Sequence, residues 1–199
     1  MHKEQLTELI YQALETEIGG VEVYETALEC VQNAKLKKEL TRYHEETKRH
    51  VDIVRELCEE LSLNPDEDTP GRQIVRQKGK ALVAAMQKAL EEGDPAAAEL
   101  VALECVVDAE TKDHQNWELI GEAAKRADAD TKHALTKAYE EVEDEEDEHL
   151  YHTKGWAREL WLKSLGIRAV LPPPEEQKDV KTAIGAARAK QQRSRMRAH

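Results

Sequence analysis

Residues 46–50 read Glu-Thr-Lys-Arg-His and residues 110–114 read Glu-Thr-Lys-Asp-His, two near-copies that begin 64 positions apart. Each copy places a carboxylate four residues before an imidazole, and residues with this spacing lie on one face of an α-helix. A third set of the same residue types follows at Glu145, Glu146 and His149. Three such sets on long helices could surround two metal ions with carboxylates and imidazoles. We therefore expect long helices packed around a shared polar centre.

The composition is typical of long helices. Among 199 residues there are 9 glycines, 6 prolines and no phenylalanine, and 35% of the residues are charged. The abundant Ala, Glu, Lys, Leu and Arg lose little side-chain freedom in a helix. No apolar run approaches the roughly 20 residues that cross a bilayer, and the polar N-terminus does not read as a signal peptide. Cys30, Cys58 and Cys105 lack the spacing of a metal or redox motif, which suits a reducing cytoplasm. From composition, hydropathy and cysteines together we expect an all-α cytoplasmic protein without a membrane contact.

The charge is unevenly distributed along the chain. The net charge is −12, but the residues from Pro172 onwards contain seven Lys or Arg and three Asp or Glu, which gives this tail +4 and leaves −16 for the rest. An acidic body repels phosphate backbones and attracts cations. We therefore do not expect nucleic acid as a partner. The expected partners are metal ions and a second copy of the chain, in a homo-oligomer such as a dimer.

Apolar residues recur at helical spacing over five segments, which predicts helices over residues 5–32, 34–63, 72–92, 95–126 and 131–165. The turns after the first and fourth segments are short, so each joins two antiparallel helices. The middle segment is about 30 Å long at 1.5 Å per residue, long enough to return the chain to the other end. The sequence thus predicts a four-helix bundle with a long helical crossover between its second and third helices, plus a basic C-terminal tail.

The end of the bundle is marked by helix-breaking residues. Gly166 follows the last apolar stripe, and three consecutive prolines stand at 172–174. We expect residues 1–168 to form the bundle and residues 169–199 to form a proline-rich linker with a basic tail, as a loose helix or as a disordered segment.

Counting from the turns places the candidate ligands at one height. Glu17 lies about 16 residues before the first turn, and Glu46 and His50 lie about 13 and 17 residues after it. The second half repeats this pattern, with Glu110 about 18 residues before the second turn and His149 about 20 after it. Residues equidistant from a turn are neighbours, so the centre would gather four carboxylates and two imidazoles. Four carboxylates balance the charge of two divalent ions.

Four motifs carry a resemblance to a known family. They are Glu17 with Tyr24 seven residues later, Glu46 with His50, Glu110 with Trp117 seven residues later, and Glu146 three residues before His149. Through these motifs, residues 5–165 resemble the ferritin-like di-iron carboxylate superfamily. That superfamily includes ferritins, bacterioferritins, rubrerythrins and small stress-associated bacterial proteins, and the last group is the nearest in character.

The resemblance implies a centre of two iron ions, or of manganese, held by Glu17, Glu46, His50, Glu110, Glu146 and His149. It also implies a position near the metal, and a catalytic role, for Tyr24. On the last helix both Glu145 and Glu146 stay open, because Glu146 has the family spacing and Glu145 has the spacing of the other two pairs. His114 is an additional candidate ligand. The second helix departs from the family pattern, since Thr47 stands three residues before its histidine.

The sequence leaves three function classes open. A ferritin-like protein could oxidise ferrous iron or reduce O₂ or peroxide in metal homeostasis or the oxidative stress response, which would make it a di-iron oxidase or peroxidase. It could instead bind metal without turnover, or be a metal-free helical interaction protein. No paired CxxC supplies electrons, and no nucleotide-binding glycine motif or hydrolase triad is visible.

Overall fold

The computed structural model describes residues 1–178 and 181–197 of the chain. In these residues every regular element is an α-helix, which confirms the all-α prediction. The helices are α1 (Lys3–Cys30), α2 (Ala34–Glu60), α3 (Pro70–Glu91), α4 (Pro95–Ala124), α5 (Ala129–Ser164) and α6 (Ala183–Arg197). The first five agree with the predicted ranges to within three residues at each end. The basic tail, for which a loose helix or disorder was expected, contains helix α6.

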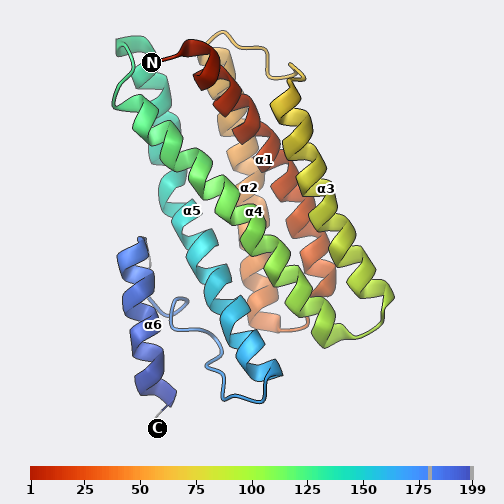
Figure 1. The fold of residues 1–199 in the computed structure, drawn as a ribbon. Coiled ribbons are helices and arrows are strands. Elements are labelled where there is room, and N and C mark those ends of the chain that lie inside the picture. Colours follow the sequence, from red (N-terminus) through yellow and green to blue (C-terminus); the bar gives the residue numbers. More distant parts are fainter. Residues whose placement is uncertain (179–180, 198–199) are drawn as a thin grey trace.

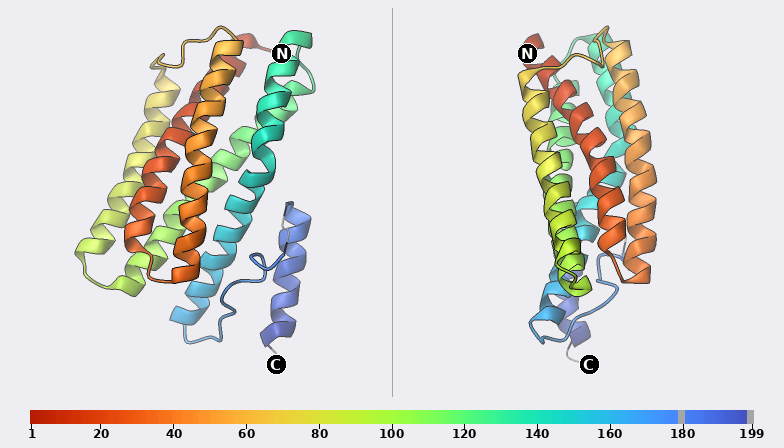
Figure 2. Two further views of the ribbon diagram at one scale, coloured as in Figure 1. Left: turned by 180° about the vertical axis from the view of Figure 1, so that it is seen from behind. Right: turned by 90° about the vertical axis from the view of Figure 1, so that its right-hand side faces the viewer.

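Four of the helices form a closed ring. Helix α1 packs on α2, α2 on α5, α5 on α4 and α4 on α1, while α3 lies outside this ring against α1 and α4. Figures 1 and 2 show that α2 and α4 run in the same direction and that α3 carries the chain back along the molecule between them. The middle predicted segment, residues 72–92, is thus the helix that connects α2 with α4. None of the helices in the described residues is long and apolar enough to cross a bilayer.

Local side-chain chemistry sets the helix ends. Asn33, Thr69, Asp94 and Asp128 cap the N-termini of α2, α3, α4 and α5, and each accepts a hydrogen bond from a backbone N–H within the following three residues. A proline takes the first position of α3 and of α4. Gly166 follows α5 with a φ of 72°, which a residue with a side chain adopts only at a cost. These ends hold the antiparallel helices in register.

The apolar core is divided into two clusters with a polar layer between them. On α1, Ile10 and Leu14 belong to one cluster, and Val23 and Ala27 belong to the other. Glu17 lies between these positions and is fully buried. A buried carboxylate that lacks a partner is costly. The division of the core therefore marks the height at which the helices carry their functional side chains.

The segment between α5 and α6 packs on the bundle. Arg158 on α5 donates hydrogen bonds of 2.6 and 2.9 Å to the two carboxylate oxygens of Glu175, which is only 2% exposed. The backbone N–H of Val170 donates to Glu159 at 2.8 Å, and Arg193 on α6 lies 3.5 Å from the same carboxylate. The predicted linker is thus in close contact with α5, and its division from the bundle at residue 168 stays a prediction.

Candidate metal centre

Five buried side chains from the four ring helices meet in the polar layer. They are Glu17 from α1, His50 from α2, Glu110 from α4, and Glu146 and His149 from α5, none more than 3% exposed. We call them the inner ligands. They form two groups, Glu17–His50–Glu146 and Glu110–Glu146–His149, and within each group the candidate ligand atoms lie within 4.8 Å of one another. Glu146 belongs to both groups, as a carboxylate that bridges two ions would.

The two imidazoles face the centre in the same way. Nδ1 of His50 lies 3.1 Å from Glu146 and 3.7 Å from Glu17, and Nδ1 of His149 lies 3.5 Å from Glu146 and 3.7 Å from Glu110. The two rings are stacked with their centroids 5.7 Å apart. Each half of the site therefore contributes one imidazole and one carboxylate of its own.

Every inner ligand keeps one atom without a hydrogen bond. These atoms are buried, and they are Oε2 of Glu17, Nδ1 of His50, Oε2 of Glu110, Oε2 of Glu146 and Nδ1 of His149. Buried polar atoms in native proteins are nearly always paired. Five exceptions of metal-ligand type in one place are therefore unlike ordinary packing. Carboxylate oxygens and imidazole nitrogens are donors that iron and manganese accept, so the residues present fit a two-metal centre.

Two further carboxylates hold the imidazoles from outside. Glu145 accepts at 2.9 Å from Nε2 of His50, and Glu46 accepts at 2.9 Å from Nε2 of His149. Two arginines of α2 pair with these outer carboxylates. Arg49 pairs with Glu145, and Arg42 pairs with Glu46 at 3.2 Å. A carboxylate on Nε2–H fixes the ring orientation and leaves Nδ1 free to bind a metal.

The inner carboxylates of α1 and α4 are also oriented by hydrogen bonds. Tyr24 donates to Oε1 of Glu110 at 2.7 Å, and Trp117 donates from its indole N–H to Oε1 of Glu17 at 2.8 Å. Both donors are almost completely buried. Each carboxylate thus has one oxygen held by an aromatic side chain of the opposite helix, while its second oxygen faces the centre. The two halves of the molecule repeat this arrangement.

Burial and charge shift the ionisation of the inner ligands in opposite directions. Burial, with the nearby Glu146, raises the pKa of Glu110 to about 8. For Glu146 burial alone would raise the pKa, but the neighbouring imidazoles of His149 and His50 outweigh it and hold the pKa at about 2. Burial would lower the pKa of His149, yet Glu146 and Glu46 raise it to about 9. Without metal, protons on the imidazoles and on Glu110 offset the buried negative charge.

The structure separates the candidates that the sequence grouped together. It brings Glu17, His50, Glu110, Glu146 and His149 to one centre. Glu146 rather than Glu145 faces inward, and both Glu46 and Glu145 lie on the outer nitrogens of the imidazoles. Tyr24 lies at the centre but contacts the carboxylate of α4 rather than that of its own helix.

His114 lies away from the inner ligands. Its Nε2 is 2.7 Å from Asp147 and its ring contacts Tyr151 edge-on, on the outer side of α4 and α5. The hydrogen bond to Asp147 raises the pKa of His114. The similarity of the two five-residue strings therefore does not extend to their histidines.

One residue at the centre was not predicted from the sequence. Asp113 is 4% exposed, has an oxygen without a hydrogen bond, and has a pKa raised well above the usual value by burial and by Glu17. Its position three residues after Glu110, on the same helix face, was the available signal. Thr47 stands three residues before His50 on α2, as Glu146 stands three residues before His149 on α5. A Cβ atom added at Gly20 would lie 3.2 Å from the Thr47 methyl group.

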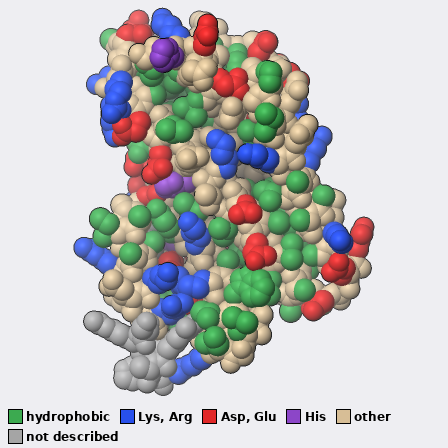
Figure 3. Space-filling view, in the orientation of Figure 1, with side chains coloured by type: hydrophobic (Ala, Val, Ile, Leu, Met, Phe, Trp, Pro, Cys, Tyr) green, Lys and Arg blue, Asp and Glu red, His purple; other side chains and the backbone are tan. Residues whose placement is uncertain are grey.

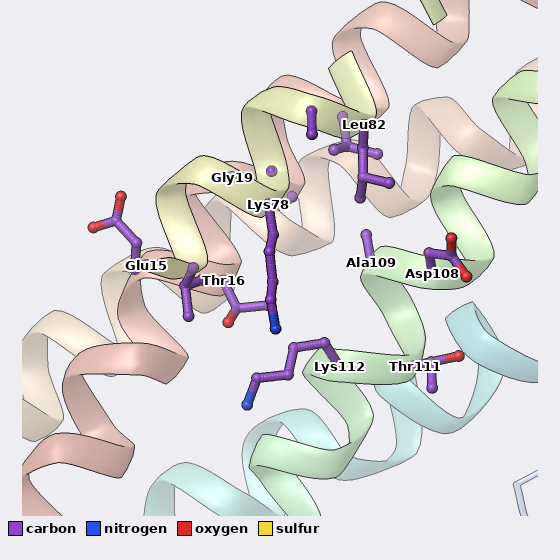
Figure 4. A pocket seen from close by; sticks show the side chains of 14 residues that line it. Glu15, Thr16, Gly19, Lys78, Leu82, Asp108, Ala109, Thr111 and Lys112 are labelled. Atoms are coloured by element: carbon purple, nitrogen blue, oxygen red, sulfur yellow. The ribbon is translucent and has the colours of Figure 1, made fainter. Parts of the chain in front are cut away.

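A pocket of about 420 Å³ lies between α1, α3 and α4, on the outer side of the helices that carry Glu17 and Glu110. Its walls are mainly apolar and include Gly19, Val23 and Leu82, and none of the inner ligands lines it. Figure 4 shows Lys78 of α3 and Lys112 of α4 extending to the same side of it. On the face drawn in Figure 3, apolar side chains also lie exposed in patches among charged ones.

Comparison of the chain with protein-family models, with curated proteins and with solved structures finds no match. We therefore infer the function from the geometry of the buried side chains.

Proposed function

We propose that this chain is a ferritin-like four-helix-bundle protein that binds a dinuclear metal centre, with iron as the metal and manganese as the alternative that the same ligands accept. We further propose that it oxidises ferrous iron or reduces O₂ or peroxide in the cytoplasm, in metal homeostasis or the response to oxidative stress. Its partners in this proposal are the metal ions and a second copy of the chain.

One observation carries the proposal. Five buried atoms of ligand type, from five side chains on four helices, face one another and lack hydrogen bonds. A helical bundle that only needed a stable core would fill this layer with apolar side chains, because an unpaired buried polar group costs about 1 to 3 kcal/mol. Two cations, one in each group, would supply the missing partners of these five atoms.

The surrounding residues prepare the centre in three ways. Tyr24 and Trp117 fix the rotation of the carboxylates of Glu110 and Glu17, and the outer carboxylates fix the imidazole rings. The two apolar clusters close the layer on either side and keep water out. The side chains that hold protons when no metal is bound would release them on binding, since metal ligands must be deprotonated.

Two bound iron ions would supply the capacity to exchange electrons with O₂ or peroxide, and the chain would supply position and charge. Tyr24 is an oxidisable side chain beside this chemistry, because its hydroxyl group contacts an inner ligand. Burial and Glu110 raise its pKa well above the usual value, so it keeps its proton as a donor at neutral pH.

Ferrous oxidation tests the proposed activity. Protein loaded with Fe²⁺ without O₂ is mixed with O₂ or H₂O₂, and formation of ferric product is followed by stopped-flow absorbance. The wild type should react faster than free Fe²⁺ at the same pH, and Glu146→Gln should lose most of the acceleration because Glu146 serves both metal positions. The exposed Glu29→Gln is the matched control. Equal rates with and without protein would remove the catalytic part of the proposal and leave binding alone.

A further inference from the structure

A second group of metal-type ligands lies beyond the first. It consists of Glu39 on α2, His152 on α5 and Glu176 in the segment between α5 and α6, and its ligand atoms lie within 4.8 Å of one another. Glu39 and His152 are 8% and 5% exposed, and Glu176 is partly buried. None of the three belongs to the inner ligands, so this group requires an explanation of its own.

The donor atoms already have the spacing of a small coordination sphere. Oε1 of Glu39 lies 3.1 Å from Nδ1 of His152, which lies 3.5 Å from Oε1 of Glu176. The hydroxyl oxygen of Tyr43 lies 2.5 Å from the same oxygen of Glu39 and 2.9 Å from the same nitrogen of His152. Tetrahedral sites with metal–ligand bonds of about 2.0 to 2.1 Å place their ligands about 3.3 Å apart. The spacings of 3.1 and 3.5 Å between His152 and the two carboxylates lie on either side of that value, whereas the two contacts of Tyr43 have the lengths of hydrogen bonds.

Hydrogen bonds hold the carboxylates in position. The indole N–H of Trp156 donates to Oε2 of Glu39 at 2.8 Å and to Oε1 of Glu176 at 3.1 Å. One fully buried side chain thus joins a carboxylate of the bundle to a carboxylate of the C-terminal segment. His152 in turn has its second nitrogen, Nε2, buried without a hydrogen-bond partner. The imidazole is therefore held by the cluster itself and not by a partner on its other side.

We propose that Glu39, His152 and Glu176 bind one divalent cation of the zinc class, with the Tyr43 hydroxyl group holding Glu39 by a hydrogen bond beside it. Two carboxylates and one imidazole offer the nitrogen and oxygen donors that Zn²⁺ accepts in four-coordinate sites. The ion fastens the C-terminal segment to the bundle, because it bonds to α2 and α5 on one side and to Glu176 on the other.

The neighbouring contacts support this fastening role. Glu175, the residue before Glu176, is held by both guanidinium nitrogens of Arg158. The segment thus already has one anchor, and the cation adds a second beside it. The ring of Tyr43 lies with its centroid 4.3 Å from that of His149, so the proposed site and the dinuclear centre are neighbours without a shared ligand.

Cobalt titration separates the proposed site from the dinuclear centre. The Glu17→Gln/Glu110→Gln protein removes two inner carboxylates and keeps the C-terminal group. Added Co²⁺ should give about one equivalent of the intense visible absorption of four-coordinate cobalt in this background. Glu176→Gln should remove that band, and the exposed Glu29→Gln should retain it. Identical bands in Glu176→Gln and Glu29→Gln, or no band in either, would overturn the proposal. If the inner ligands bind no cobalt in any variant, this band should still appear. Failure of the dinuclear centre can therefore be told apart from failure of the proposed zinc-class site.

Proteolysis tests the fastening. Trypsin cleaves after Lys178, an exposed residue two positions beyond Glu176. At Zn²⁺ of 100 times Kd, opening of the segment should fall about 100-fold, and cleavage should slow by the same factor. Glu176→Gln should show no slowing, and the Glu17→Gln/Glu110→Gln protein should slow like the wild type. Cleavage that is as fast with Zn²⁺ as without it would overturn the proposal even where Zn²⁺ binds.

Discussion

The carboxyl group of Glu110 should make the metal-free protein less stable as the pH rises. Burial and Glu146 raise its pKa from 4.5 to about 8 in the folded state. Below pH 4.5 the group is protonated in both states and does not affect their difference. Between pH 4.5 and 8 the unfolded chain ionises while the folded chain keeps the proton, so the free energy of unfolding falls. Above pH 8 the loss is complete.

The magnitude follows from the two pKa values. One pKa unit corresponds to about 1.36 kcal/mol, so the whole shift corresponds to at most about 5 kcal/mol. It is an upper limit because Glu110 titrates together with Glu146 and His149. Glu110→Gln keeps the shape and the acceptor for Tyr24 but cannot ionise. The variant should lose about 2 to 4 kcal/mol less than the wild type between pH 5 and pH 9.

Urea unfolding followed by circular dichroism at pH 5, 7 and 9, with a chelator present, measures this difference. Glu29→Gln, an exposed position on the same helix as Glu17, should follow the wild type at every pH. With Fe²⁺ added under nitrogen the order should reverse, because metal binding stabilises only the protein that retains the ligand. A metal-free Glu110→Gln protein whose free energy of unfolding falls with pH as steeply as that of the wild type would refute the raised pKa of the buried Glu110 carboxyl group.

Three further outcomes are expected. Tyr24→Phe should lower the free energy of unfolding by about 1 to 3 kcal/mol, the cost of leaving the buried Oε1 of Glu110 without its donor, and a loss below 0.5 kcal/mol in thermal or urea unfolding would contradict the contact. His114→Ala should leave the metal content unchanged, and a loss of metal measured by elemental analysis would show that it is a ligand. Truncation after Leu171 should lower Tm, whereas truncation after Thr182 should change it little, because the segment between them carries the buried carboxylate anchored by α5. Equal Tm values for the two truncations would contradict this.

Sequence periodicity was sufficient for the helices and for the height of the site. Apolar spacing and the turn residues give each helix to within three residues, and counting from the turns places Glu17, Glu110 and His149 in one layer. Helix length and turn position fix height because each residue advances the helix by about 1.5 Å. This part of the architecture depends on local chemistry alone.

The rotation of each helix about its axis could not be predicted from the sequence. One residue turns the helix by about 100°, so neighbouring glutamates at 145 and 146 face different surroundings. Only tertiary packing decides which of them faces the centre. For the same reason the two similar strings place Glu46 outside and Glu110 inside. The docking of the C-terminal segment was equally hidden, because it depends on single ion pairs such as Arg158 with Glu175 and not on a repeated pattern.

Metal stoichiometry tests the central claim most directly. Fe²⁺ is titrated into the Glu176→Gln protein under nitrogen, so that the C-terminal group does not contribute, and the bound iron is counted after dialysis. We expect close to two ions per chain, and we expect His50→Ala combined with His149→Ala to remove most of them. Binding of no iron by the protein with its histidines intact would contradict the dinuclear centre.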